Sequence, residues 1–130
     1  SYGIGVSTND YIDANGIAKA TRIAMFNAIM LLSPVPDYVI IDHFTLPELK
    51  IPHHGITHGD RLCFTIACAS ILAKVTRDHM VEQIAERYPH YYFTSNKGYG
   101  TAEHLESLRN YGPCPLHRRS FEPLRPGLLS

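Results

Sequence analysis

The sequence predicts an α/β domain, because helical and strand patterns follow one another along its 130 residues. A helical pattern covers about residues 10 to 32, a β-rich apolar run follows at Tyr38–Ile41, and a longer helical pattern extends from Leu62 to Arg87. A chain of this length with 45% hydrophobic residues has enough apolar surface for one core. We therefore expect one domain rather than tandem domains.

The first helix is predicted by an apolar stripe and by residues suited to its ends. The stripe recurs at three- and four-residue steps, at Ile17, Ala20, Ala24, Ala28 and Leu31. Ser7–Asp10 offers several N-caps, and Pro34 and Pro36 end the pattern. The apolar run Tyr38–Ile41 is typical of a strand covered on both faces, and Asp42 follows at its carboxyl end.

A short strand and a long helix are predicted next. Gly55–Asp60 has the pattern of a short edge strand bracketed by glycines. The helix over Leu62–Arg87 is apolar or small on every face as far as Ala73, which predicts a buried start. After Lys74 it becomes amphipathic, and Pro89 stops it. One or two strands cannot cover such a helix, so we expect further strands upstream and an exposed sheet edge, which favours dimerisation or strand swapping.

The last third of the chain contains a loop, a helix and a tail. The loop, residues 90 to 100, is rich in tyrosine and glycine. Thr101 is a candidate N-cap for a helix that reaches about Tyr111 and is ended by Gly112 and Pro113. The tail has no periodic pattern. We therefore divide the chain into residues 1–112 and a basic, proline-rich C-terminal segment, residues 113–130.

Composition narrows the class of protein. Twelve Lys and Arg residues balance twelve Asp and Glu residues, so attraction to nucleic acid must come from local clusters of charge. Three cysteines argue against a secreted disulfide scaffold and for a reducing compartment. Ser1–Val6 does not have the pattern of a signal peptide, and no apolar run approaches the length of a membrane span. We expect a soluble, cytoplasmic protein without membrane contact.

Two carboxylates are candidate catalytic residues. Asp42 follows a predicted buried strand, where α/β proteins present reacting groups, although a capping role has about the same weight. Asp78 shares a helix face with Lys74 and Ser70, and an intrahelical pair with Lys74 is its plainer interpretation. Two such carboxylates could hold Mg²⁺ or Mn²⁺, since these cations take oxygen ligands. Two acids, however, rarely complete a two-metal site.

A zinc site is the least favoured function. His53, His54 and His58 lie close together and Cys63 and Cys68 follow, but the cysteines are five positions apart on a predicted buried helix and point in different directions. Structural zinc sites use tighter, matched ligand pairs. We therefore rank a structural zinc module below the other possibilities.

Local positive charge is a clearer signal. Near the C-terminus, cationic residues outnumber acids: Lys97, Arg109, His117, Arg118, Arg119 and Arg125. Aromatic residues are interleaved with them: Tyr91, Tyr92, Tyr99 and Phe121. Such a surface meets phosphates with cations, and sugars or bases with aromatic rings. A solvated arginine tail beside core aromatics would give the same composition, so both interpretations stay open.

Three longer motifs occur in order along the chain. They are Ala69–Asp78 (ASILAKVTRD), Lys97–Thr101 (KGYGT) with His104, and Gly112-Pro113 followed by His117–Phe121 (HRRSF). Upstream, Tyr11–Ile17 and Val39–Asp42 extend the pattern. Together these stretches resemble the type 2 ribonuclease H family, ribonuclease HII, over essentially the whole chain.

The resemblance implies an RNase H-like fold that hydrolyses the RNA strand of RNA–DNA hybrids. It also implies cutting at ribonucleotides embedded in duplex DNA, a DNA-repair activity, with Mg²⁺ or Mn²⁺. Carried over by motif, Asp42 and Asp78 are the third and fourth of four metal-binding carboxylates, and Tyr99 stacks on the sugar at the junction of ribonucleotide and deoxynucleotide. Further substrate contacts are expected from four cationic residues: Lys74, Lys97, Arg118 and Arg119.

The family's first two carboxylates belong to an Asp-Glu-x-Gly-Arg-Gly segment that this sequence does not contain. The acids before Asp37 are Asp10 and Asp13, which match the start of the first helix instead. We therefore expect an RNase H-like fold truncated at its N-terminus, with residues 1–112 forming the C-terminal part of the catalytic domain. The 130-residue chain alone is expected to be inactive, and the alternative is a non-catalytic fragment that binds hybrids.

Overall fold

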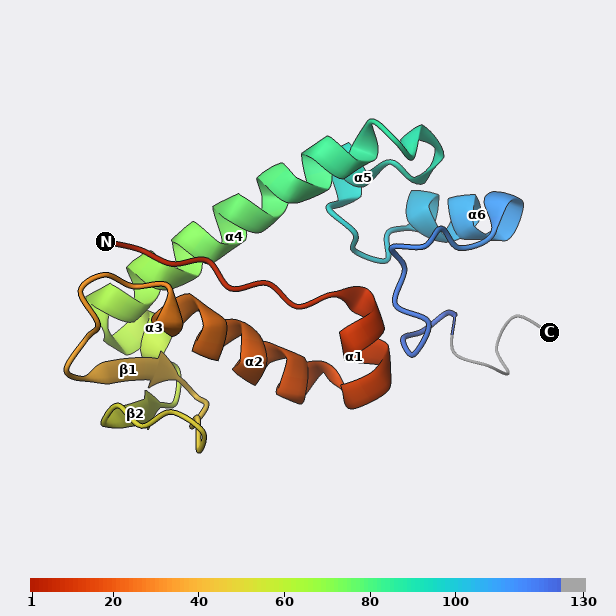
Figure 1. The fold of residues 1–130 in the computed structure, drawn as a ribbon. Coiled ribbons are helices and arrows are strands. Elements are labelled where there is room, and N and C mark those ends of the chain that lie inside the picture. Colours follow the sequence, from red (N-terminus) through yellow and green to blue (C-terminus); the bar gives the residue numbers. More distant parts are fainter. Residues whose placement is uncertain (125–130) are drawn as a thin grey trace. The chain divides into compact units, whose positions relative to one another are not determined.

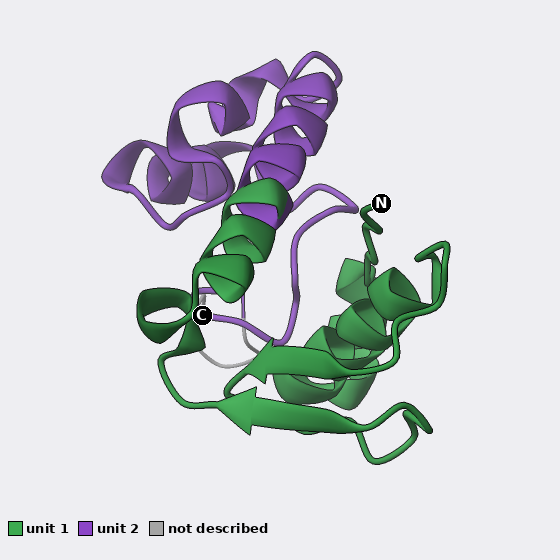
Figure 2. Ribbon diagram, turned by 90° about the vertical axis from the view of Figure 1, so that its left-hand side faces the viewer, with its two compact units in different colours: residues 1–72 green, residues 73–130 purple. Residues whose placement is uncertain are grey.

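The structure, a computed structural model, describes residues 1–124 (Figure 1). The chain divides into two compact units, Ser1–Leu72 and Ala73–Ser130, shown in two colours in Figure 2. Unit 1 contains α1 (Asn9–Asn15), α2 (Ile17–Met30), β1 (Val39–Asp42), β2 (His53–Ile56) and α3 (Gly59–Leu62). Helix α4 (Phe64–Ala85) runs from unit 1 into unit 2, which continues with η1 (Pro89–Tyr91), α5 (Phe93–Asn96) and α6 (Ala102–Tyr111). The predicted α/β class is confirmed.

The expected single helix over residues 10 to 32 is wrong, because Gly16 divides it into α1 and α2. Gly16 has φ = 82°, a left-handed value that a glycine adopts without steric cost, and its N–H donates to the Ile12 carbonyl at 2.7 Å. Thr8 caps α1 by accepting a hydrogen bond from the Tyr11 N–H at 3.2 Å. Of the predicted apolar stripe, Ala20 is buried, whereas Ile17 and Leu31 are exposed. The other buried residue of α2, Ile29, lies outside that stripe.

The sheet of unit 1 has two parallel strands among the described residues, β1 and β2, with Val39 opposite His53 and Asp42 opposite Ile56. Strand β1 confirms the predicted apolar strand within one residue. Strand β2 lies at residues 53–56 rather than within 55–60, because His58 adopts a left-handed backbone (φ = 57°) and α3 begins at Gly59. A buried cluster packs α2 against β1 and the following loop: Ile29, Ile41, Leu46 and Leu49.

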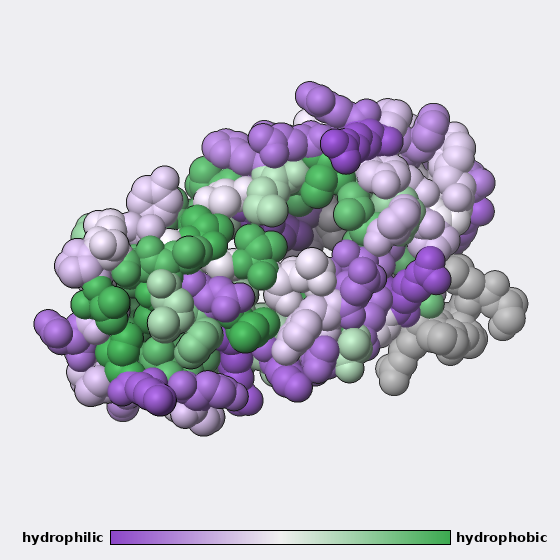
Figure 3. All heavy atoms as spheres, viewed as in Figure 1, coloured by the Kyte–Doolittle hydropathy of each residue, from purple (hydrophilic) through white to green (hydrophobic). Residues whose placement is uncertain are grey.

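The predicted burial of the start of α4 is wrong. Within α4, all of which the structure describes, Ile66 is the one buried residue. Phe64 is 85% exposed, Ile71 is 62% exposed and the neighbouring Leu62 of α3 is 75% exposed. The two described strands and α2 bury their apolar faces against each other, so they leave these side chains uncovered. Figure 3 shows apolar side chains gathered over the visible face of unit 1.

Unit 2 forms around the aromatic segment that the sequence assigned to a loop. That segment contains the short helices η1 and α5, and its buried cluster is Tyr91, Phe93, Leu108 and Cys114. Tyr91 is therefore a core residue, so for this residue the structure favours the core interpretation over the nucleic-acid surface that the sequence also left open. The predicted α6 is confirmed together with its N-cap, because Thr101 accepts a hydrogen bond from the His104 N–H at 3.3 Å.

No helix within residues 1–124 is both long enough and apolar enough to cross a membrane.

Candidate active site

Asp42 is presented by the end of β1, as the sequence predicts. It is the last residue of the strand and is half-buried, and its Oδ1 accepts a hydrogen bond from the Gly59 N–H at 2.8 Å. A Cβ at position 59 would lie 2.7 Å from the Ile66 Cδ1 atom and 3.4 Å from Asp42 Oδ1, so a larger residue there would require the end of the Ile66 side chain to shift. The backbone of α3 thus holds this carboxylate at the carboxyl end of the sheet.

The chain turns sharply after Asp42. His43 has φ = 62°, a value uncommon outside glycine, and its N–H donates to the Ile56 carbonyl at 2.9 Å. The second carboxylate oxygen of Asp42 has no hydrogen-bond partner among the described residues. Asp42 therefore has one oxygen anchored on the first N–H of α3 and one oxygen without a hydrogen-bond partner among the described residues, an arrangement that fits both a capping role and a ligand role.

Asp78 lies on α4 and is engaged by cations. Lys74 Nζ donates to Asp78 Oδ2 at 2.7 Å, and Arg77 Nη1 lies 3.8 Å from Oδ1. The hydrogen bond from Lys74 lowers the pKa of Asp78 and, reciprocally, raises the pKa of Lys74. The intrahelical pair that the sequence offered as an alternative is present, and it keeps the Asp78 carboxylate ionised.

Tyr99 is 66% exposed, and Arg77 connects its loop to α4. The Arg77 guanidinium lies over the Tyr99 ring, with 5.3 Å between Cζ and the ring centroid, and its Nη2 donates to the Lys97 carbonyl at 2.9 Å. The Lys97 ammonium forms an ion pair with Glu82 of α4, and this hydrogen bond lowers the pKa of Glu82. One face of α4 therefore holds the Lys97–Tyr99 loop by two separate contacts.

The structure thus joins four of the predicted site residues in unit 2: Lys74, Asp78, Lys97 and Tyr99. Arg118 lies elsewhere in its own pair, with its guanidinium 4.0 Å from the centroid of the Phe121 ring, and Arg119 is exposed. Asp42 belongs to unit 1, and Arg125, which the charge pattern included, lies outside the described residues.

Sequence reasoning missed the residues that connect this group. Arg77 lies inside the recognised motif, but its contact with Lys97 spans 20 positions and has no local signal. Glu82 is one helical turn beyond Asp78 on the same helix, and it pairs across 15 positions. An i, i+4 rule finds pairs within a helix, so it finds Lys74 and Asp78 but not these contacts.

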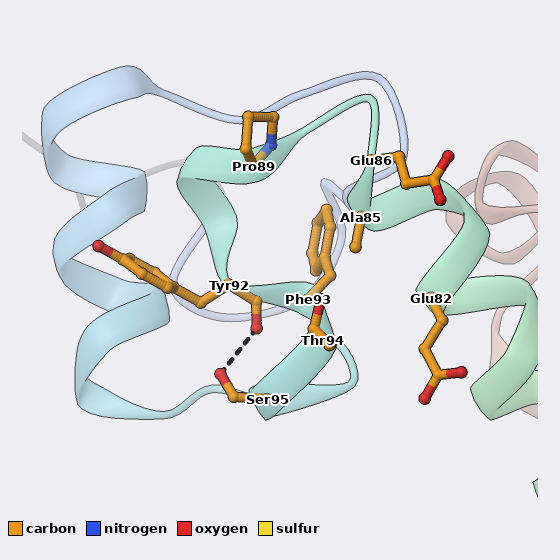
Figure 4. A pocket seen from close by; sticks show the side chains of 8 residues that line it. All are labelled: Glu82, Ala85, Glu86, Pro89, Tyr92, Phe93, Thr94 and Ser95. Carbon is orange, nitrogen blue, oxygen red and sulfur yellow. Dashed lines mark hydrogen bonds between the residues drawn. The ribbon is translucent and has the colours of Figure 1, made fainter.

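A hollow of about 740 Å³ in unit 2 lies between the end of α4 and the segment that contains η1 and α5 (Figure 4). Figure 4 shows Glu82 of α4 and Glu86, which follows the end of α4, on one side of it, and Tyr92, Phe93 and Ser95 on the other. Of the two carboxylates at its edge, Glu82 is ion-paired with the Lys97 ammonium. The hollow is lined by none of the predicted site residues.

The two candidate aspartates have the type of ligand atom that a hard divalent cation prefers, but they are too few for a complete site. Asp42 and Asp78 offer carboxylate oxygens, which Mg²⁺ and Mn²⁺ prefer, and each carboxylate is held in place by a neighbour. Over residues 1–124, no group of three or more His, Cys, Asp or Glu side chains is arranged to hold a metal ion. Each aspartate thus offers a carboxylate ligand, and neither belongs to a complete metal centre among the described residues.

The family model for ribonuclease HII matches residues 1–123. The chain belongs to the ribonuclease HII family. Its mixed α/β architecture with a small parallel sheet is consistent with an RNase H-like fold. The matched residues include every described strand and helix.

Curated relatives named ribonuclease HII match almost the whole chain. One from Dehalococcoides mccartyi is 47% identical over 125 residues, which cover 96% of this chain and 59% of the relative. One from a Geobacillus species is 51% identical over 96% of this chain and 45% of the relative. One from Chloroflexus aurantiacus is 46% identical over 98% of this chain and 60% of the relative. The chain therefore spans about half to three-fifths of the length of these ribonuclease HII proteins.

Proposed function

We propose that this chain, together with an N-terminal portion like that of its relatives, forms a metal-dependent endoribonuclease. The proposed enzyme hydrolyses the RNA strand of RNA–DNA hybrids and cuts at ribonucleotides embedded in duplex DNA, a role in DNA repair. The observation that carries the proposal is the family match over residues 1–123, which includes Asp42 and Asp78 within their motifs. We call this longer protein the full-length protein.

The proposed metal ligands are Asp42 and Asp78, acting on Mg²⁺ or Mn²⁺ together with carboxylates of the N-terminal portion. When bound, the cations supply activation of the attacking water and stabilisation of charge on the departing oxygen. Asp42 contributes the oxygen that the Gly59 N–H leaves free. Asp78 contributes a carboxylate that Lys74 keeps ionised, so a cation meets a charged ligand even in mildly acidic solution.

The proposed substrate contacts are the cations of unit 2 and Tyr99. Lys74 is 72% exposed at its side chain, and its ammonium has donors beyond the one used by Asp78, so it can reach a phosphate oxygen. Lys97, Arg118 and Arg119 bind further phosphates along the strand. The ring of Tyr99, exposed at the loop tip, packs on the sugar at the ribonucleotide junction in the wide minor groove.

Two features of the chain support a proposed cytoplasmic location and a proposed tendency of the isolated chain to self-associate. Cys63, Cys68 and Cys114 are free thiols in the structure, which supports a reducing, cytoplasmic location. The exposed apolar residues of unit 1, among them Leu62 and Phe64, support self-association of the isolated chain. A dimer or strand swap through the two-stranded sheet is one form that this association can take.

The test compares the 130-residue chain with the full-length protein on two substrates, a continuous RNA–DNA hybrid and a DNA duplex with a single ribonucleotide. We expect the full-length protein to cut both when Mg²⁺ or Mn²⁺ is added, and the chain alone to cut neither. Binding of the hybrid by the chain, read as a gel shift without cutting, would support the alternative of a non-catalytic binding fragment. Failure of the full-length protein to cut either substrate would overturn the proposed activity.

A further inference from the structure

Tyr99 stands on a tight turn that a single residue closes. Lys97 and Gly98 both have left-handed backbones, with φ = 49° and φ = 80°. Asn96 makes both hydrogen bonds across this turn, since its side-chain Oδ1 accepts from the Gly98 N–H at 2.8 Å and its carbonyl accepts from the Tyr99 N–H at 2.8 Å. The direction in which Tyr99 leaves the turn therefore depends on where Asn96 lies.

The side chain of Asn96 is itself anchored in the interior of unit 2. It is 4% exposed, and its Nδ2 donates to the Tyr91 carbonyl at 2.7 Å. Only one orientation of the amide satisfies both neighbours, because the Gly98 N–H needs an acceptor and the Tyr91 carbonyl needs a donor. The amide therefore joins the exposed turn to the buried aromatic core.

A pair of histidines, His104 and His117, lies next to this anchor. His104 is 5% exposed, its Nδ1 lies 3.1 Å from the Tyr91 carbonyl, and its Nε2 lies 3.2 Å from His117 Nε2. His117 Nδ1 accepts a hydrogen bond from the Cys114 N–H at 3.0 Å. With both imidazoles neutral, one consistent proton arrangement has His117 Nε2–H donating to His104 and His104 Nδ1–H donating to Tyr91. Asn96 thus adjoins a hydrogen-bonded series formed by the buried His104 and the half-buried His117.

Packing alone does not orient the Tyr99 ring. The ring is largely exposed, and its one ring contact among the described residues is with the Arg77 guanidinium, a flexible and exposed side chain. Arg77 and Glu82 hold Lys97 at its carbonyl and its ammonium, whereas the N–H groups of Gly98 and Tyr99 donate to Asn96. Without the Asn96 acceptors, the left-handed backbone at Lys97 and Gly98 loses the hydrogen bonds that close the turn, and that backbone costs free energy in a residue other than glycine. The turn would then sample other shapes and carry Tyr99 with it.

We propose that Asn96 is a positioning residue for Tyr99: its buried amide, anchored on the Tyr91 carbonyl beside the His104–His117 pair, holds the turn that presents the ring to the ribonucleotide junction. This inference rests on the proposed function, because it assigns Asn96 to the use of Tyr99 in that reaction. Asn96 does not touch the substrate in this role and acts through the backbone of Gly98 and Tyr99.

The deciding experiment is a double-mutant cycle in the full-length protein, with kcat/KM measured on a DNA duplex that contains one ribonucleotide. Asn96→Ala and Tyr99→Ala should each reduce kcat/KM, by about 10-fold or more for Tyr99→Ala, and the double variant should be little worse than Tyr99→Ala. Asn110→Ala, an exposed asparagine of α6, is the matched control and should keep the parent rate. Losses that multiply in the double variant would overturn the inference.

A second variant and a second measurement distinguish loss of the turn from unfolding of the whole protein. Asn96→Asp keeps an oxygen for the Gly98 N–H but replaces the donor to the Tyr91 carbonyl with a carboxylate oxygen. Amide hydrogen exchange in the 130-residue chain then reports the turn directly, without activity. We expect faster exchange at Gly98 and Tyr99 in both Asn96 variants, with α6 amides protected as in the parent. Unchanged protection at Gly98 and Tyr99 would overturn the inference.

The two proposals fail in different ways. If the full-length parent cuts no substrate, the proposed activity is wrong, and the exchange measurement still decides whether Asn96 holds the turn. If the parent cuts and Tyr99→Ala lowers the rate, but Asn96→Ala leaves kcat/KM on the single ribonucleotide unchanged, the proposed activity stands and the positioning role is wrong.

Discussion

The two units hold their aspartates by different means. In unit 1, the backbone N–H of Gly59 anchors Asp42. In unit 2, Asp78 is held by the charged side chains of Lys74 and Arg77. Local backbone geometry thus sets the position of Asp42, whereas electrostatic contacts on a helix set the state of Asp78.

The interiors of the two units also differ in the kind of residue that they bury. Unit 1 buries an aliphatic cluster between α2 and β1 and leaves large apolar side chains exposed. Unit 2 closes around aromatic rings and a hydrogen-bonded series of polar groups, with Asn96, His104 and Ser107 buried. Buried polar groups are tolerated when they are paired, so the interior of unit 2 restricts the positions of its side chains more strictly than the aliphatic interior of unit 1 does. The same restriction extends to the Lys97–Tyr99 loop, which is bonded to Asn96.

The largest effect is expected from the two aspartates, one in each unit. In the full-length protein, Asp42→Asn and Asp78→Asn should each lower metal-dependent turnover by orders of magnitude, because an amide keeps the shape and loses the anionic ligand. Rates on a continuous hybrid over a range of Mg²⁺ concentrations measure this. Glu48→Gln and Glu86→Gln, exposed acids of the two units, should keep the parent rate. Near-normal turnover of Asp78→Asn at low Mg²⁺ would mean that Asp78 forms the ion pair with Lys74 and is not a metal ligand.

The next effect concerns the exposed ring of unit 2. Tyr99→Ala should reduce cutting at a single embedded ribonucleotide by about 10- to 100-fold, since stacking contacts are worth about 1–3 kcal/mol. Tyr99→Phe keeps the ring and should lose less. The same variants are assayed on a continuous hybrid, where the loss should be smaller. Equal losses on both substrates, or a lower melting temperature with an unchanged rate, would contradict a junction-reading role.

The exposed apolar face of unit 1 predicts self-association of the 130-residue chain. Phe64→Lys should raise the dissociation constant of the associated form roughly 10-fold or more, because burial of such a side chain is worth about 1.5–3 kcal/mol. Sedimentation velocity over a concentration series measures it. Met80→Lys, on the unit 2 part of the same helix, is the control and should change little. A parent chain that stays monomeric at all concentrations would refute the prediction.

The smallest effect should come from the buried histidines of unit 2. Burial lowers the pKa of His117 below its ordinary value of 6.5, and a charge on His104 would lower it further. The folded state therefore binds fewer protons than the unfolded state, so stability present above about pH 6.5 is lost as the pH falls. We expect the melting temperature of the chain to drop between about pH 7.5 and pH 5.5, by a few degrees.

The matched comparison for that prediction is His117→Gln, which removes the titrating group. Its melting temperature should depend less on pH over the same range, whatever its absolute stability. NMR titration of the His117 ring gives the protonation state directly. An equally steep pH dependence in His117→Gln would show that other groups control the acid response.

Local signals predicted much of the fold. The β-rich run before Asp42 and the cap at Thr101 each depend on neighbours in sequence, and the structure confirms them. The division at Gly16 and the turn at His58 were missed, because a left-handed backbone at one residue interrupts a pattern that continues on both sides. The burial of α4 was misjudged, since apolar composition predicts what a helix could bury and not which partner covers it.

The sequence by itself determined the α/β class, the family motifs and the identity of Asp42, Asp78 and Tyr99 as candidate site residues, because these depend on residue type and short spacing. Only the tertiary structure decided that Gly59 anchors Asp42, that Arg77 spans from α4 to the Tyr99 loop, and that Asn96 closes the turn beneath the ring. Such contacts join residues that the folded backbone brings together, or select one of several hydrogen-bond partners that a side chain could find. Their geometry is a property of packing, which no periodicity in the chain encodes.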